Sequence, residues 1–368
     1  MGGTASAAQI EPTARLKVVK TTTLWKSPDG KVGAQRARFS PDKRWLAWFT
    51  TDGTVCTANL QNNRRVRSFR APADSTFSDL VWSRQSQLAV CVRTIGKDGV
   101  TRRVAVARPE QGNLDLLTGT NGAYNVAWRD DGKAIAFSTK TALFHRDFAT
   151  GKTENLLDGQ KGWRPKGAPA FEDLVFHGER VIARTSGTMN WRAAAPGGGA
   201  SMFVPVRGFC SDAPRDRLYM VRWLPGPVGI PRGCGVSGSI FPVKQPDATG
   251  RDEASDLKAR DLPAPVVPFD HTAAKPYWLV DIWDATYPTT LRISPDGKTL
   301  TFCGVKAGVL SKNAWREFCI WRVPSDGSKP PAAVARCGPI FKRIDVGDTH
   351  FIGWRYKIDK AVVLGDLT

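Results

Sequence analysis

Histidines and the acidic residues beside them are the side chains best suited to proton transfer or metal binding in this chain. The spacing of His145, His177, His271 and His350 produces neither an HExxH pair nor another close pair, so the sequence predicts no metal site. His271 follows Asp270 directly, but adjacency in sequence does not make a proton relay. We expect His145 on a strand, as a core or surface residue rather than a catalytic one.

Motifs for nucleophilic serine and for nucleotide chemistry are missing. A nucleophile elbow requires G-x-S-x-G at a sharp turn between a strand and a helix. The nearest approximation, Gly-Val-Ser-Gly at 235–238, lies in an irregular region. Neither a phosphate loop nor the glycine signature of a dinucleotide-binding fold is present. The motifs therefore predict no catalytic residue and no cofactor.

A carbohydrate-active site would gather carboxylates, arginine, lysine or tyrosine from separate loops, so sequence spacing does not reveal it. The best cluster of this kind is Asp281, Asp284 and Tyr287, close to Trp283. The alternative interpretation is a strand whose tryptophan packs inside while its acids face solvent. We favour the second interpretation and keep the first as an alternative glycan site.

Arginine is concentrated in two short runs, at 64–70 and at 102–103. The 53 Lys and Arg exceed the 34 Asp and Glu, which gives a formal net charge of +19. A charge of this size favours anionic partners, such as nucleic acid, an acidic glycan, a phosphorylated lipid surface or an acidic protein. For a single run, the alternative is that cations on edge strands prevent aggregation.

Seven cysteines form no CxxC motif and no zinc-type spacing with histidine. Their odd number leaves at least one thiol free. We expect Cys303 and Cys319 on two successive strands, where a cross-strand disulfide is geometrically conceivable. Buried free cysteines that act as small hydrophobic residues are an equal alternative.

The overall composition is that of a turn-rich globular chain of 368 residues. Hydrophobic residues make up 41%, with 35 Gly, 25 Pro and 13 Trp, which excludes a coiled coil, a collagen and a wholly disordered chain. No stretch reaches the roughly 18 apolar residues of a membrane helix. Residues 1–9 contain the small residues of a secretory cleavage site without the basic start or apolar middle of a signal peptide. We expect an extracytoplasmic location, periplasmic or cell-surface, with a cytoplasmic or virion chain left open.

An internal repeat in the sequence predicts the strands that would position these candidate side chains. Residues 37–48 (ARFSPDKRWLAW) align with 291–302 (LRISPDGKTLTF), and looser copies lie at 126–137 and 80–90. Each copy predicts a strand, a tight turn and a second strand, because proline presets φ for the turn and Asp bonds backbone amides within it. Two further strand-like segments follow the copies. Four short strands in roughly forty residues are typical of a β-propeller blade.

The S-P-D-G-K turn between two strands resembles the WD40-like repeat of TolB-type β-propellers. This resemblance implies an all-β propeller of six or seven four-stranded blades, with weaker copies at 171–207 and 215–243. The tail at 351–364 is predicted to form the first two strands of a final blade. A strand from residues 15–25 is expected to complete that blade and to remove free sheet edges.

The predicted organisation is a flexible N-terminus at 1–14 and a single propeller domain at 15–368. A Pro- and Gly-rich irregular insertion is expected at 225–276. Recurrent tryptophans at equivalent strand positions predict packing between blades. They are Trp45, Trp48, Trp82, Trp128, Trp321 and Trp354.

Propellers host scaffolds, adaptors and enzymes, so the resemblance does not specify an activity. Our first hypothesis is a non-enzymatic binding or scaffold propeller that docks an acidic macromolecular partner within a larger assembly. The alternatives are a lyase or hydrolase acting on acidic glycans, and a propeller that contacts nucleic acid. The candidate partner-binding residues, expected on outermost strands at the rim of neighbouring blades, are Arg64, Arg65, Arg67, Arg102 and Arg103.

Overall fold

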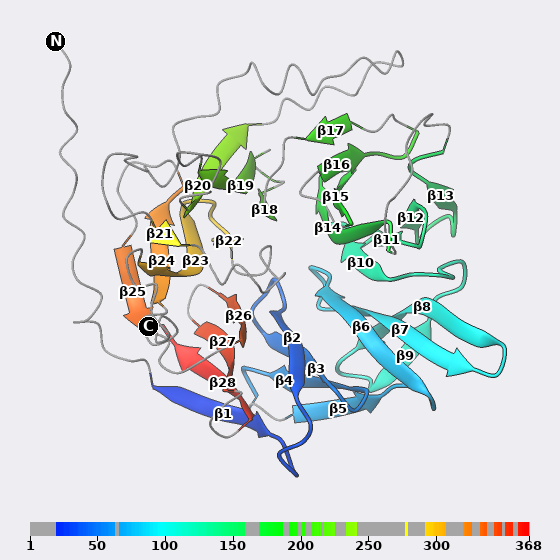
Figure 1. Ribbon diagram of the computed structural model, residues 1–368, viewed down its shortest axis with the longest axis horizontal. Helices are drawn as coiled ribbons and strands as arrows, with labels where there is room; N and C mark the ends of the chain where they lie inside the picture. The colour runs from blue at the N-terminus through cyan, green and yellow to red at the C-terminus, as the bar shows by residue number, and fades with distance from the viewer. Residues whose placement is uncertain are drawn as a thin grey trace.

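The strands of this chain form seven antiparallel sheets arranged in a ring (Figure 1). The computed structural model describes residues 20–62, 66–158, 169–186, 191–197, 201–203, 208–212, 214, 217–224, 233–240, 277–278, 291–306, 319–325, 332–336, 342–347, 350–355 and 360–367. Six sheets have at least four strands, and one has three described strands. The chain is therefore an all-β propeller. Six or seven blades were expected, and the described strands form seven sheets, one for each blade.

The blades are numbered here in chain order. Blade 1 consists of β2 (Ala34–Phe39), β3 (Trp45–Thr50), β4 (Thr54–Asn59) and β5 (Val66–Arg70). Blade 2 consists of β6 (Ser75–Trp82), β7 (Leu88–Gly96), β8 (Gly99–Arg108) and β9 (Asn113–Leu116). Blade 3 consists of β10 (Asn125–Trp128), β11 (Ala134–Ser138), β12 (Leu143–Asp147) and β13 (Thr153–Asn155). Blade 4 consists of β14 (Phe171–His177), β15 (Arg180–Thr185), β16 (Trp191–Ala194) and β17 (Ser201–Phe203).

The remaining three blades depart from four consecutive strands. Blade 5 contains β18 (Gly208–Asp212), β19 (Arg217–Leu224) and β20 (Gly233–Ile240). In blade 6, β21 (Tyr277–Trp278) and β22 (Arg292–Ile293) both pair with β23 (Thr299–Lys306), which continues to β24 (Cys319–Pro324) and β25 (Ala332–Arg336). Blade 7 joins β26 (Lys342–Val346), β27 (His350–Arg355) and β28 (Ala361–Asp366) to β1 (Thr21–Lys26) from the other end of the chain.

Closure of the ring by an N-terminal strand is confirmed. Strand β1 pairs antiparallel with β28, from Thr21 opposite Gly365 to Lys26 opposite Ala361. The expected place of the tail was wrong by one strand. Because β26 precedes them and forms the inner strand, β27 and β28 are the second and third strands of blade 7.

The repeated turn is built by the same hydrogen bonds in its two best copies. The hydroxyl of Ser40 accepts from the backbone N–H of Trp45 at 2.9 Å, and the N–H of Ser40 donates to the Trp45 carbonyl at 2.8 Å. In the second copy, Ser294 exchanges the same two bonds with Thr299. Each turn needs one residue with positive φ, and this is a lysine in the first copy (Lys43, φ 58). The serine and the turn therefore fix the register of each inner hairpin.

The second strands of blades 1 and 3 are buried along their length. All six residues of β3 and all five of β11 are buried, because the neighbouring blades cover both faces of the sheet. The outer strand β5 instead has three exposed residues. This difference explains why the apolar runs in the sequence mark the middle of each blade rather than its edge.

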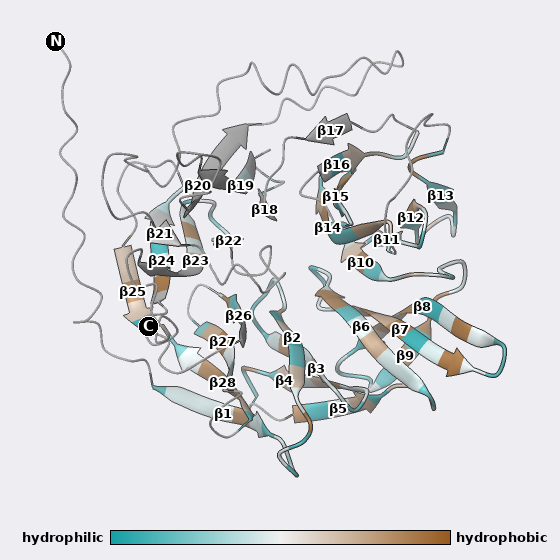
Figure 2. Cartoon of the chain, in the orientation of Figure 1, coloured by the Kyte–Doolittle hydropathy of each residue, from teal (hydrophilic) through white to brown (hydrophobic). Residues whose placement is uncertain are grey.

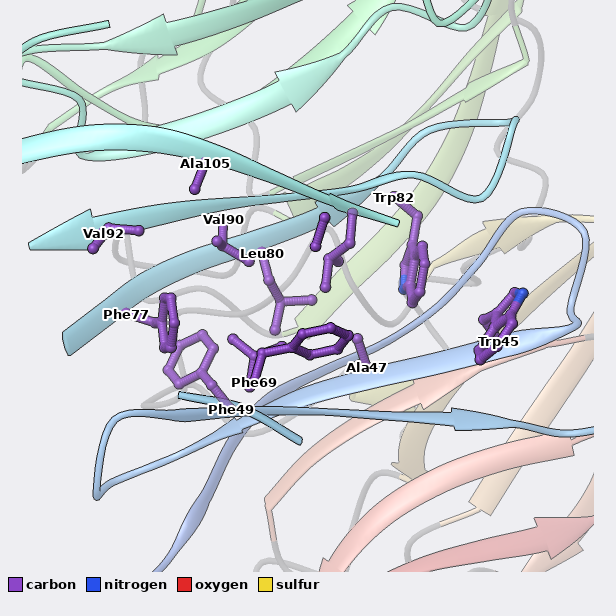
Figure 3. Close-up of a cluster of buried hydrophobic side chains, with 13 residues drawn as sticks. Trp45, Ala47, Phe49, Phe69, Phe77, Leu80, Trp82, Val90, Val92 and Ala105 are labelled. Atoms are coloured by element: carbon purple, nitrogen blue, oxygen red, sulfur yellow. The ribbon is translucent and has the colours of Figure 1, made fainter. Parts of the chain in front are cut away.

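The core lies between adjacent blades. One buried cluster joins Trp45, Phe49 and Phe69 of blade 1 to Phe77 and Trp82 of blade 2 (Figure 3). The six tryptophans expected to pack between blades are all buried. Their prediction as core residues is confirmed.

Part of the range 225–276, for which we predicted an irregular insertion, forms a strand that the weaker repeat copy at 215–243 also covers. Strand β20 lies within this range and pairs with β19 over eight residue positions. The range that we expected to be irregular therefore includes part of blade 5. Residues 241–276 and 1–14 lie outside the described residues. Within the described part of the chain, no helix has the length and apolarity needed to cross a membrane.

Candidate functional site

A cavity of about 640 Å³ lies where the inner strands of six blades meet. Its lining comes from β2, β6, β10, β14, β18 and β22, together with inner-hairpin turns such as 40–43. In Figure 1 these strands face the middle of the ring, so the cavity is the central channel of the propeller. The channel is one of two features that can bind another molecule.

The first ion pair of the channel is Arg36 with Asp79. Arg36 has a positive φ of 43° at a register irregularity in β2, and its guanidinium contacts the Asp79 carboxylate. Asp79 is 8% exposed and also accepts the backbone N–H of Val126 in blade 3 at 3.1 Å. The Asp79 charge raises the pKa of Arg36. One carboxylate thus connects three consecutive blades.

The second ion pair repeats this arrangement at the closure of the ring. Arg292 of β22 lies 2.8 Å from the carboxylate of Asp345 in β26. Asp345 is 1% exposed and accepts the backbone N–H of Phe39 in blade 1 at 3.0 Å. Blades 6, 7 and 1 are therefore joined in the same way as blades 1, 2 and 3.

Arg38 lines the same channel without an acidic partner. It occupies the repeat position of Arg292, and both residues donate from Nη1 to the carbonyl of the preceding residue, at 3.0 and 3.1 Å. Among the described residues, no carboxylate lies within ion-pair distance of Arg38. Desolvation by burial lowers the pKa of Arg38 to about 10, although the charge of Asp345 acts in the opposite direction.

A ring of polar contacts joins the inner hairpins at one end of the channel. These contacts link successive blades: Ser86 with Asp42 at 2.6 Å, Arg84 with Asp130 at 3.2 Å, Gln85 with the Asp131 carbonyl at 2.8 Å, and Arg129 with Glu179 at 2.7 Å. Most of these groups are exposed, so each contact stabilises the fold only modestly. They connect the inner hairpins of blades 1 to 4.

The hairpin of β7 and β8 is the second feature. Its strands have nine and ten residues and remain paired from Leu88–Ala107 to Gly96–Gly99. The half of the hairpin near its turn lies outside the core, because the residues of β7 after Val92 are no longer buried. Ile95 and Val100 face each other across the strands and are 51% and 46% exposed.

Cations lie near this apolar pair, with Arg93 and Arg102 on its side of the hairpin and Arg103 on the other side. Arg93, Arg102 and Arg103 lie on the same two strands, and Lys97 lies in the turn. Arg102 stacks over the ring of Tyr124 at 4.1 Å, and Arg103 donates to the Asn121 side chain at 3.1 Å. Figure 2 shows hydrophobic and hydrophilic residues side by side along this hairpin. We call residues 93–103 the basic hairpin.

The predicted partner-binding arginines occupy different places. Arg67 is exposed on the outermost strand β5, as expected, and donates to the carbonyls of Pro109 and Glu110 in blade 2 at 3.1 and 2.7 Å. Arg102 and Arg103 lie on the third strand β8 and not on an outermost strand. Strand β9 pairs with residues 105–108 of β8 and does not reach these two arginines. None of the three pairs with an acid among the described residues. Arg64 and Arg65 lie outside the described residues.

The register does not favour the expected disulfide. Cys303 lies opposite Ile320, and Cys319 lies opposite Gly304, one position away from the facing register that a cross-strand bridge requires. Cys56, Cys91 and Cys210 are buried free cysteines. Burial raises the pKa of the Cys56 and Cys210 thiols to about 11, so these two are unreactive.

Some of the remaining predicted residues lie within the part of the chain that the structure describes. His145 is buried on β12, the third strand of blade 3, which confirms its expected position. His177 Nδ1 lies 3.0 Å from the Ser211 hydroxyl of blade 5. No group of three or more metal-ligating side chains is present in the part of the chain that the structure describes. The alternative glycan residues Asp281, Asp284 and Tyr287 lie outside it, as does His271.

Sequence reasoning did not identify the residues of the channel. Arg36, Asp79 and Asp345 are far apart in sequence and share no motif. A signal did exist for Arg38 and Arg292, because both stand two positions before the serine of the repeated S-P-D turn. An arginine at the same place in two inner strands predicts two guanidinium groups in one channel.

Comparison with known proteins supports the fold. No family model matches the chain, and no curated protein matches it in sequence. Among solved structures, it resembles the β-propeller domain of the Trilobed protease from Pyrococcus furiosus, with a TM-score of 0.56 at 11% identity, covering 92% of this chain and 98% of that one. That propeller is described as having an open velcro topology, whereas β1 closes the ring here.

Two further similar structures are non-protease propellers. The propeller domain of Cps50 (Swd1) from Myceliophteria thermophila has a TM-score of 0.55 at 13% identity, with 91% and 98% of the two chains covered. The RRP9 WD40 repeats have a TM-score of 0.58 at 9% identity, with 96% and 99% covered. These likenesses show a propeller with WD40-like repeats. The TolB-type family itself stays a prediction.

Proposed function

We propose that this protein is a non-enzymatic scaffold propeller that docks an acidic macromolecular partner through the basic hairpin. The observation that carries the proposal is the exposed Ile95–Val100 pair, with Arg93 and Arg102 facing each other next to it on the same side of the hairpin. Protein interfaces combine an apolar centre with a polar rim. A strand pair that extends beyond its blade presents both to a partner.

Charge indicates the chemistry of that partner. Arg102 and Arg103 have no acidic partner among the described residues, so their charges are available to an incoming carboxylate. The formal net charge of +19 adds a long-range field that speeds encounter with acidic proteins. An acidic protein with an apolar patch is therefore the expected partner.

Solved propellers of both enzymes and scaffolds share this fold, so the comparisons agree with a scaffold without identifying its partner. The proposal includes membership of a larger assembly. An extracytoplasmic location remains part of the prediction from the sequence.

Charge reversal on the basic hairpin tests the proposal. The double variant Arg102→Glu/Arg103→Glu should lose partners that co-purify with the full chain from its source at low salt. The matched control is Lys31→Glu/Lys133→Glu, which changes the net charge equally at two exposed sites outside the hairpin. Retention of the same partners by both variants would overturn the proposal.

The two alternatives predict different results in the same preparations. A glycan-active enzyme would shorten uronate-rich polymers, with activity unaffected by the hairpin variant. A nucleic-acid-binding propeller would retain RNA or DNA in a strongly salt-dependent manner. If either result is observed and no acidic protein is bound, the corresponding alternative replaces the scaffold proposal.

A further inference from the structure

We propose that Arg38 is the centre of a binding site in the central channel for the oxyanion group, phosphate or carboxylate, of a small molecule. The site lies on the inner strand β2, whereas the basic hairpin lies on β7 and β8. The inference therefore does not depend on the scaffold function.

The internal repeat supplies the first argument. Arg38 and Arg292 occupy the same position before the S-P-D turn and make the same local hydrogen bond. Arg292 is neutralised by the buried carboxylate of Asp345. The equivalent guanidinium in blade 1, that of Arg38, has no such carboxylate among the described residues, so its N–H donors can bind a ligand.

The acids around the channel are already engaged. Asp79 contacts Arg36, Asp130 contacts Arg84, and Asp42 accepts from the hydroxyl of Ser86. Asp173 accepts from Arg184 Nε at 2.8 Å. Each of these four carboxylates of the lining therefore has a partner other than Arg38.

A planar guanidinium presents several N–H donors in a fixed fork that matches the oxygens of carboxylate and phosphate. Within the described part of the chain, Arg38 uses this fork for one hydrogen bond, whose acceptor is the carbonyl of Ala37. Burial lowers the pKa of Arg38 to about 10, yet the group stays charged at neutral pH. An oxyanion would offset this desolvation.

The size of the channel suits a small molecule. Its volume of about 640 Å³ falls within the usual range for ligand pockets, roughly 300–1,000 Å³. Arg36 and Arg292 line the same space, but each is paired with a carboxylate, so Arg38 is the guanidinium that would bind the anion. Phosphate esters and small polycarboxylates share the required chemistry.

Calorimetric titration of the full chain with inorganic phosphate and, separately, with citrate tests the site at constant ionic strength. Saturable binding of at least one probe is expected. Arg38→Gln should weaken it by about tenfold to a hundredfold, which is the typical effect of losing a charge-assisted hydrogen bond. Arg70→Gln, an exposed arginine on β5, is the matched control and should bind as the wild type does. Preference for phosphate or for citrate identifies the source of the oxyanion.

Chemical labelling tests the same site without a variant. Phenylglyoxal modifies free guanidinium groups, so peptide mapping should show Arg38 modified faster than Arg36 and Arg292. The bound probe should slow this reaction at Arg38 and leave Arg70 unaffected. Absence of binding by both probes, equal affinity of the Arg38→Gln and Arg70→Gln variants, or labelling of Arg38 that neither probe slows would overturn the inference.

Discussion

At the scale of single residues, two buried carboxylates have an unusual structural role. Asp79 and Asp345 each bind an arginine in the channel and a backbone N–H of the next blade. A buried carboxylate that loses its partners is costly, and so is an arginine left without its carboxylate. Asp79 and Asp345 therefore hold neighbouring blades together and also pair with arginines of the channel.

Asp345→Ala should lower the free energy of unfolding by about 3 kcal/mol, because Arg292 and the Phe39 N–H both lose their acceptor. The control is Asp130→Ala, whose pair with Arg84 is exposed and should change stability by less than about 1 kcal/mol. Chemical denaturation measures both variants. Equal effects would contradict the role assigned to Asp345.

A second residue-scale prediction concerns acid sensitivity. Burial is the main cause that lowers the pKa of His145, and the nearby charge of Arg129 lowers it further, while Asp147, Glu179 and Glu154 act in the opposite direction. The unfolded chain therefore binds a proton at this histidine more readily than the folded chain does. Stability from this group is complete above the ordinary histidine pKa and declines as the pH falls through it towards the lower folded value.

His145→Gln removes the titrating group, so its stability should fall less steeply than that of the wild type between about pH 7 and pH 5. Melting temperatures across this range measure the difference. Parallel curves for the two proteins would show that His145 does not contribute.

At the scale of elements, the sequence predicted the inner hairpins best. The S-P-D turn and its flanking apolar segments correctly located the inner strands of blades 1 and 6, since local hydrogen bonds of Ser40 and Ser294 determine that geometry. Strand β20 lies where the weaker repeat copy at 215–243 and the expected irregular insertion at 225–276 overlap. Its glycines and serines have low strand propensity, and pairing with β19 overrides it. The tail was shifted by one strand because β26 has no repeat motif.

Gly365 gives an element-scale prediction for blade 7. A Cβ at this position would overlap the ring of Phe351, which is fully buried between β27 and its neighbours. Gly365→Ala should therefore destabilise the protein by about 1–3 kcal/mol, as overpacking of a core does. In Gly33→Ala the added methyl group meets Thr51 at ordinary contact distance, so its stability should change by less than about 0.5 kcal/mol. Melting curves of the two variants measure this difference. Equal curves would show that packing against Phe351 does not restrict residue 365.

At the scale of the whole molecule, the ring depends on pairing between its two ends. Removal of residues 1–26 deletes β1 and leaves the edge of β28 unpaired. Open sheet edges promote association, so the truncated chain should melt at a lower temperature and form larger species in light scattering. A truncated chain that remains monomeric with an unchanged melting temperature would contradict closure by β1.

The candidate sites were less predictable than the fold. The basic runs indicated an anionic partner, and Arg102 and Arg103 do flank an exposed apolar pair. That pair could not be recognised beforehand, because apolar alternation in a strand normally indicates burial. The channel joins residues from blades separated by hundreds of positions, which only the closed ring brings together.

Site-specific photo-crosslinking in the source cells tests the central claim most directly. A photoreactive residue in place of Val100, at the exposed end of the basic hairpin, should crosslink to one acidic protein. The same residue in place of exposed Ala149, in the turn between β12 and β13 of blade 3, should not. Adding Arg102→Glu/Arg103→Glu should abolish the crosslink at position 100. A crosslink pattern that is the same at both positions, or that survives the charge reversal, would contradict docking through the basic hairpin.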